Sequence, residues 1–122
     1  MTRSKVRNRS ITSASQNDLH DSFGELYQSL TNAYWVASTI VDKDRIRGAA
    51  DQVFDILTDL NRADLKSRTE DFAELKGQVA IATKKLTALQ ADIDSIIHNV
   101  GVATQVVGAI AKALTASTTF FG

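Results

Sequence analysis

LKSRTEDFAELKGQVAIATKKLTALQADIDSIIHNVGVATQVVGAIAKAL, residues 65–114, is the stretch that decides the fold of this chain. An apolar residue stands at every seventh position of it, as Leu65, Phe72, Val79, Leu86, Ile93, Val100, Val107 and Leu114. A second apolar series falls between these positions, at Leu75, Ala82, Leu89, Ile96, Ala103 and Ile110. Apolar residues at the first and fourth positions of a heptad (a and d) are typical of helices that supercoil around a partner helix. The pattern therefore predicts one very long C-terminal helix over residues 62–116.

Two shorter helical segments precede the long one. Over residues 15–41, apolar residues recur in alternating steps of four and three, at Leu19, Phe23, Leu26, Leu30, Ala33, Ala37 and Ile40. Over residues 43–60, one helical face carries Ile46, Ala50, Val53, Leu57 and Leu60. The apolar period slips after Ile40 and again after Leu60, so we expect the helices to end there. Asp42 or Asp44 is the expected N-cap of the second helix, and Asn61 that of the third.

These three helices predict an all-α fold with a single helical domain over residues 15–122. The simplest arrangement is an elongated antiparallel hairpin, a coiled-coil bundle in which the long helix lies against the two shorter ones. A compact four-helix bundle, with a break near residues 98–101, is the alternative. The uninterrupted apolar spacing through Ile96, Val100 and Ala103 favours the hairpin.

The composition agrees with long helices. The chain has 122 residues and contains no proline, which costs about 3 kcal/mol inside a helix. It also contains no cysteine, which excludes a disulfide scaffold and a thiolate metal site. Arg3, Lys5, Arg7 and Arg9 precede the first acidic residue, so we expect residues 1–14 to form a mobile basic tail. The apolar core of a signal peptide is missing from this tail, which predicts a cytoplasmic protein or one exported without a cleavable signal peptide.

The segment 95–116 differs from the rest of the predicted long helix because it contains one charged residue, Lys112. Apolar residues occupy most of its faces. A helix that is apolar on most faces must have most of its surface buried against other protein or lipid. Three covers are possible: other copies of the chain or a helical partner, a lipid interface, or the chain itself folded back. The predicted interaction face consists of Trp35 in the first helix and of Ile97, Gly101, Val102, Val106, Gly108, Ala109, Ala113, Phe120 and Phe121 at the C-terminal end.

Three aromatic residues of the first helix raise the same question. Tyr27 and Tyr34 fall beside its apolar seam, and Trp35 falls on the far side from the seam. Large aromatic side chains most often pack in a core. Tyrosine and tryptophan are also enriched at oligomer and membrane interfaces, where these three would serve as anchors.

The residues that carry catalysis or bind metals form no recognisable motif. His20 and His98 are the only histidines, and neither belongs to a helical His pair or to a Glu-x-x-His unit. The sequence also lacks a glycine-rich phosphate loop and a nucleophile elbow. We therefore expect no enzymatic activity, no cofactor and no metal site. Nucleic-acid binding is expected to be limited to nonspecific contacts of the basic tail.

The sequence thus favours a non-enzymatic interaction or assembly protein. We expect it to form a homo-oligomer or to bind a helical protein partner through the apolar C-terminal third of its long helix. The alternative is a membrane-active protein that inserts residues 95–116 into lipid. In outline, long helices with an apolar segment resemble the helical pore-forming toxins of the cytolysin A type, and this resemblance concerns the architecture and not the function.

Overall fold

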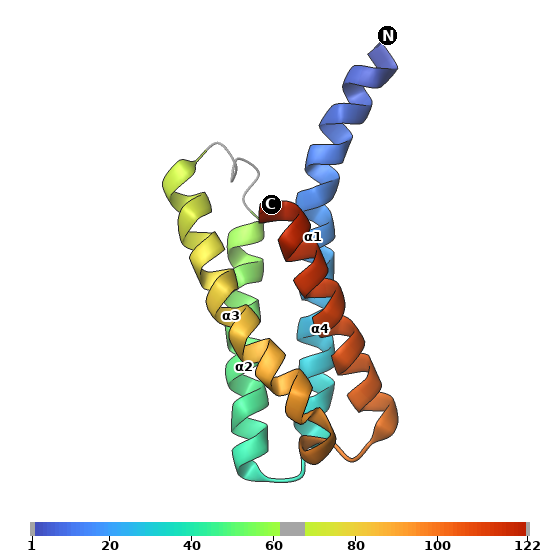
Figure 1. The fold of residues 1–122 in the computed structure, drawn as a ribbon, viewed down its shortest axis with the longest axis vertical. Helices are drawn as coiled ribbons and strands as arrows, with labels where there is room; N and C mark the ends of the chain where they lie inside the picture. The colour runs from blue at the N-terminus through green and yellow to red at the C-terminus, as the bar shows by residue number, and fades with distance from the viewer. Residues whose placement is uncertain (1, 62–67, 122) are drawn as a thin grey trace.

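In the computed structural model the chain forms four helices that run alternately up and down (Figure 1). They are α1 (Thr2–Val36), α2 (Ile40–Leu60), α3 (Thr69–Ile96) and α4 (Val100–Phe121). The structure describes the backbone of residues 2–61 and 68–121, and the side chains of residues 16–61 and 68–121. Within these ranges there is no strand, so the all-α prediction is confirmed. The architecture is the four-helix bundle that the sequence offered as the alternative.

Each helix packs against two others. α1 contacts α2 and α4, and α3 contacts the same two helices, with the more extensive contacts made by α1. The α1–α2 and α3–α4 turns lie together at one end of the bundle, while the start of α1 projects beyond the other end (Figure 1). The residues predicted as a mobile basic tail belong to this projecting part of α1. Their side chains lie outside the described residues, so the mobility of the tail stays a prediction.

The buried core confirms the apolar seams predicted for α1 and α3. In α1 and the turn after it, the seam residues from Leu19 to Ala37 are buried at steps of four and three, whereas Ile40, predicted to continue the seam, is 76% exposed. In α3, the seam residues from Leu75 to Ile96 are each at most 4% exposed. The α2 helix adds Ile46, Ala49, Ala50, Val53, Ile56 and Leu60 to this core. Burial of each large aliphatic side chain contributes about 1.5–3 kcal/mol, so these seams supply most of the stabilisation.

The prediction of a single helix over residues 62–116 is wrong. α3 ends at Ile96, the next residue, Ile97, has extended backbone angles (φ −126°, ψ 115°), and α4 begins at Val100. Asn99 caps α4, because its Oδ1 accepts a hydrogen bond from the N–H of Val102 at 3.0 Å. Asparagine is among the best N-cap residues, since its side chain satisfies an N–H that has no partner within the helix. The chain therefore reverses at residues 97–99.

The apolar seam changes face after this reversal. The buried residues of α4 are Ala103, Val106, Ala109, Ile110, Ala113, Ser117 and Phe120. Most of them occupy the fourth and seventh positions of the heptad (d and g) instead of the first and fourth. Val100, expected in the seam, is 78% exposed, and Val107 is half-buried. Because α4 runs back along α3 and also packs on α1, it turns a different face inward than a continued helix would.

The other predicted helix ends also need correction. α1 ends at Val36 instead of residue 41, and α2 begins at Ile40. The N-cap of α2 is Thr39, whose hydroxyl oxygen accepts a hydrogen bond from the N–H of Asp42 at 3.1 Å. Asn61 is the C-cap of α2 and does not start the next helix. α3 begins at Thr69, and residues 62–67, where the chain reversal was predicted, lie outside the described residues.

Candidate docking surface

The structure divides the predicted interaction face between the core and the surface. Five of its residues are at most 7% exposed: Ile97, Val106, Ala109, Ala113 and Phe120. Gly101, Gly108 and Trp35 are exposed, and Val102 and Phe121 are half-buried. Of the three covers considered for the segment 95–116, the structure shows the third, because α4 folds back against α3 and α1. Most of the apolar surface that motivated the predicted docking site is therefore enclosed within one chain.

A second set of apolar side chains remains exposed at the end that holds the two turns. We call it the apolar end, and it consists of Trp35, Val36, Ile40, Val41 and Val100. Trp35 is 73% exposed, and Ile40 is 76% exposed. These residues come from three different helices, α1, α2 and α4. Exposed apolar side chains that gather at one end of a bundle are candidates for an interaction site.

Hydrogen bonds hold the two turns of the apolar end together. Both the backbone N–H and the hydroxyl of Ser38 donate to the carbonyl oxygen of Ile96, each at 3.1 Å. Next to them, Ala37 and Ile97 form an isolated antiparallel β-bridge. Lys43 fixes the end of α1 by donating from Nζ to the carbonyl oxygen of Tyr34 at 2.7 Å. The apolar end is thus preorganised, which lowers the entropic cost of binding a partner.

A groove of about 310 Å³ runs from the apolar end along α1 and α2. We call it the α1–α2 groove, and its lining consists of Tyr27, Leu30, Thr31, Tyr34, Trp35, Ile46, Arg47, Ala50 and Asp51. The rings of Tyr34 and Trp35 meet edge to face, with centroids 5.2 Å apart. Farther along, the ring of Tyr27 lies 5.7 Å from that of Phe54 on α2. Aromatic side chains therefore stand at both ends of the groove.

The aromatic residues of α1 differ in their surroundings, because some pack against the core and one is exposed. Tyr27 and Tyr34 are half-buried and pack against the core, whereas Trp35 points into solvent. Phe54 is 54% exposed and was missed by sequence reasoning. A signal for it exists, because Ile40, Arg47 and Phe54 recur every seven residues on the side of α2 away from its buried residues.

The charges beside the groove are of both signs. Arg47 and Asp51 are exposed and lie one helical turn apart on α2. Within the described ranges neither of them takes part in an ion pair, whereas the neighbouring Arg45 pairs with Asp92 of α3 at 3.0 Å. Arg47 and Asp51 are therefore available to a partner.

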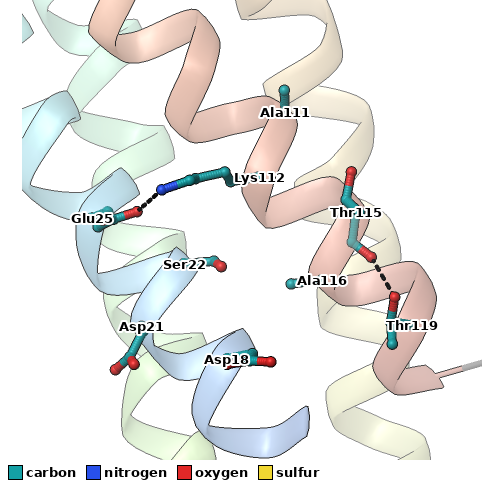
Figure 2. Close-up of a pocket in the computed structure, with 9 residues that line it drawn as sticks. All are labelled: Asp18, Asp21, Ser22, Glu25, Ala111, Lys112, Thr115, Ala116 and Thr119. Carbon is teal, nitrogen blue, oxygen red and sulfur yellow. Dashed lines mark hydrogen bonds and ion pairs between the residues drawn. The ribbon is translucent and has the colours of Figure 1, made fainter. Parts of the chain in front are cut away.

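A larger groove, of about 580 Å³, separates α1 from α4 (Figure 2). Figure 2 shows Lys112 of α4 reaching across it to Glu25 of α1, with Nζ and Oε2 3.1 Å apart. Ser22 lies in this groove, but neither a histidine nor a cysteine is among its described lining residues. The nearby His20 and Asp21 are 3.9 Å apart at Nδ1 and Oδ1, which is too long for a hydrogen bond. The groove therefore provides no arrangement of nucleophile and base.

No protein-family model, no curated protein and no solved structure matches this chain. The function must therefore be argued from its own surface. Among the described helices, α4 alone has the length and the apolar composition to cross a membrane. The same properties suit a helix of a soluble bundle, and α4 packs on α1 and α3 with one third of this apolar window buried. Within the described residues, no group of three or more histidines and acidic residues is arranged to hold a metal ion.

Proposed function

We propose that this protein is a non-enzymatic helical assembly protein that self-associates through apolar side chains centred on Trp35 and Ile40. The observation that carries the proposal is the exposure of these two large side chains, 73% and 76%, on a rigid end of the bundle. A largely exposed tryptophan leaves much apolar surface in water, and tryptophan is one of the residue types enriched among those that dominate binding energy. Trp35 also lines the α1–α2 groove, which extends the surface.

This proposal keeps the kind of function expected from the sequence and moves its location. The sequence placed the contact on residues 95–116, and five residues of that predicted face now lie in the core. Trp35 is the member of the predicted face that is both large and exposed. The proposed contact is therefore on the α1 and α2 side of the bundle.

The test is the molar mass of the purified protein, measured by light scattering over a range of concentrations. We expect the mass to rise from that of one chain towards that of two as the concentration increases. A double variant, Trp35→Ser with Ile40→Ser, should stay monomeric over the same range. The matched control is Ile81→Ser, which removes a residue that is 56% exposed on α3 and should leave the association unchanged. A wild-type protein that is monomeric at every concentration would reject the proposal.

Membrane binding is the second candidate, and the composition of α4 favours it. Insertion of residues 95–116 requires α4 to leave the core, where Val106 is fully buried. A Val106→Asp variant would disrupt the fold and so cannot test insertion alone. Val100→Asp, at an exposed position of α4, is the better variant. Co-sedimentation with anionic or neutral vesicles that is lost in Val100→Asp would support this candidate, and an absence of wild-type binding to either vesicle would exclude it.

A further inference from the structure

We infer that a second copy of this chain docks on the α1–α2 groove, related to the first by a two-fold axis that runs in the interface, beside α2 and level with its midpoint. This inference rests on the proposed self-association and adds the geometry of the contact. It follows from the order in which charged, aromatic and small side chains are arranged along the groove.

The outward face of α2 presents one stripe of side chains to a partner. Ile40, Arg47 and Phe54 recur at intervals of seven residues, so they lie above one another on the helix. Asp51 follows Arg47 by four residues and joins the same side. Each of these four residues is exposed, while Ile46 and Ala50 are buried residues of α2 that line the same groove as Arg47 and Asp51.

Arg47 and Asp51 can pair with each other across an interface in which the α2 helices of two copies run antiparallel. α2 spans Ile40–Leu60, so its midpoint is near Ala50. Arg47 and Asp51 stand on either side of this midpoint, about 6 Å apart along the helix. A two-fold axis that passes between the two copies, perpendicular to α2 and at the level between Arg47 and Asp51, places Arg47 of each copy opposite Asp51 of the other copy. Such reciprocal contacts are what an interface between identical subunits requires.

The same axis also matches the aromatic residues. Trp35 lines the groove with Ile46 and Arg47, whereas Phe54 lies eight residues beyond Ile46, about 12 Å farther along α2. The point halfway between Ile46 and Phe54 is again Ala50. After the two-fold rotation, Trp35 of one copy therefore lies opposite the Tyr27–Phe54 ring pair of the other. Small side chains between the aromatic positions, Thr31 and Ala50, permit a close approach of the helices.

The exposed apolar area is appropriate for such a dimer. From their exposed fractions, Trp35, Ile40 and Phe54 together leave roughly 400 Å² of apolar side-chain surface in contact with water. A stable interface buries about 800 Å² on each partner. These three residues would supply about half of that area, close to the usual apolar share of an interface. The polar and charged residues around them would supply the remainder.

A charge-reversal experiment tests the geometry. Arg47→Asp places two acidic residues opposite each other at both reciprocal contacts, and Asp51→Arg places two basic residues there. We expect each variant alone to weaken the dimerisation constant about tenfold. An equimolar mixture of the two variants should recover association as a heterodimer, because every contact then joins opposite charges. The variant that carries both changes should recover association by itself. Lys84→Asp, on α3, is the control and should behave as the wild type.

The outcomes separate this inference from the proposed function. If the Arg47→Asp and Asp51→Arg variants each dimerise as strongly as the wild type, and mixing them does not strengthen the association, the two-fold contact at the groove is overturned. If, in that case, the Trp35→Ser and Ile40→Ser double variant is monomeric, the protein does self-associate, but through the apolar end alone. A wild-type protein that never dimerises overturns both. Arg47 and Asp51 are exposed and unpaired within the described part of the chain, so their variants should fold, and equal melting temperatures check this.

Discussion

Asn99 has the largest consequence of any single residue for the architecture. Its side chain caps α4 by accepting a hydrogen bond from the N–H of Val102, and its carbonyl oxygen accepts one from the N–H of Ala103 at 2.9 Å. These bonds start a new helix after only three intervening residues, 97–99. Without a cap at this place, the apolar heptads of residues 65–114 would favour a continuous helix.

The first prediction concerns this cap. Asn99→Ala should lower the free energy of unfolding by about 1 kcal/mol, because the N–H of Val102 loses its partner. Asn99→Gly should cost only a few tenths of a kcal/mol, since glycine tolerates the cap conformation. Chemical denaturation measures both values. The control is Asn32→Ala, an exposed position inside α1, which should have no destabilising effect. Equal stability of Asn99→Ala and the wild type would contradict the capping role.

At the scale of the helices, the sequence predicted the interiors of α1 and α3 well and their ends poorly. The seam from Leu75 to Ile96 is buried as expected, because periodic burial along one helix is a local property of the sequence. The break after Ile96 was predicted only as the alternative, because Ile96 and Ala103 both point into the core from opposite sides of the turn. Their separation of seven residues imitates an unbroken heptad.

The second prediction compares Val106, which lies in the buried seam of α4, with Val100, which the continuous heptads place in the seam. Val106→Ala should lower the free energy of unfolding by about 2 kcal/mol, because Val106 is fully buried. Val100→Ala should change it by less than about 0.5 kcal/mol, because Val100 is 78% exposed. A continuous coiled coil requires the reverse order, with Val100 in the seam. Thermal or chemical unfolding of the two variants, side by side, decides between them.

The candidate docking surface was predicted only in part. Trp35 was named from the sequence because its position lies off the seam of its helix. Phe54 was not, since an isolated aromatic residue on a polar helical face carries little signal until Tyr27 is seen beside it. Val102 shows the opposite error. It was placed on the predicted interaction face, but it is half-buried against the core, so Val102→Ser should cost stability.

At the scale of the whole molecule, the decisive feature is that α4 completes the core. Which helix covers an apolar segment depends on contacts between distant parts of the chain, and heptad spacing does not report these. The basic start of α1, the acidic α1–α4 groove and the exposed α1–α2 groove surround a core that one chain closes by itself.

The third prediction follows from this role of α4. Deletion of residues 100–122 should abolish the cooperative thermal transition, because it exposes the buried faces of α1 and α3. The loss is visible by circular dichroism as a broad, shallow melt. In an elongated hairpin, the same deletion would shorten the rod and leave the paired remainder to unfold cooperatively. Retention of a sharp transition in the truncated chain would therefore contradict the bundle.

The most direct test of the account is the fluorescence of Trp35, the only tryptophan of the chain, as a function of protein concentration. Trp35 is largely exposed in the single chain, and the proposed dimer places it against the aromatic pair of a second copy. We predict that the emission shifts to shorter wavelength as the protein is concentrated, over the same range in which the molar mass doubles. An emission maximum that stays at the solvent-exposed value while the mass doubles would place the contact elsewhere and contradict the account.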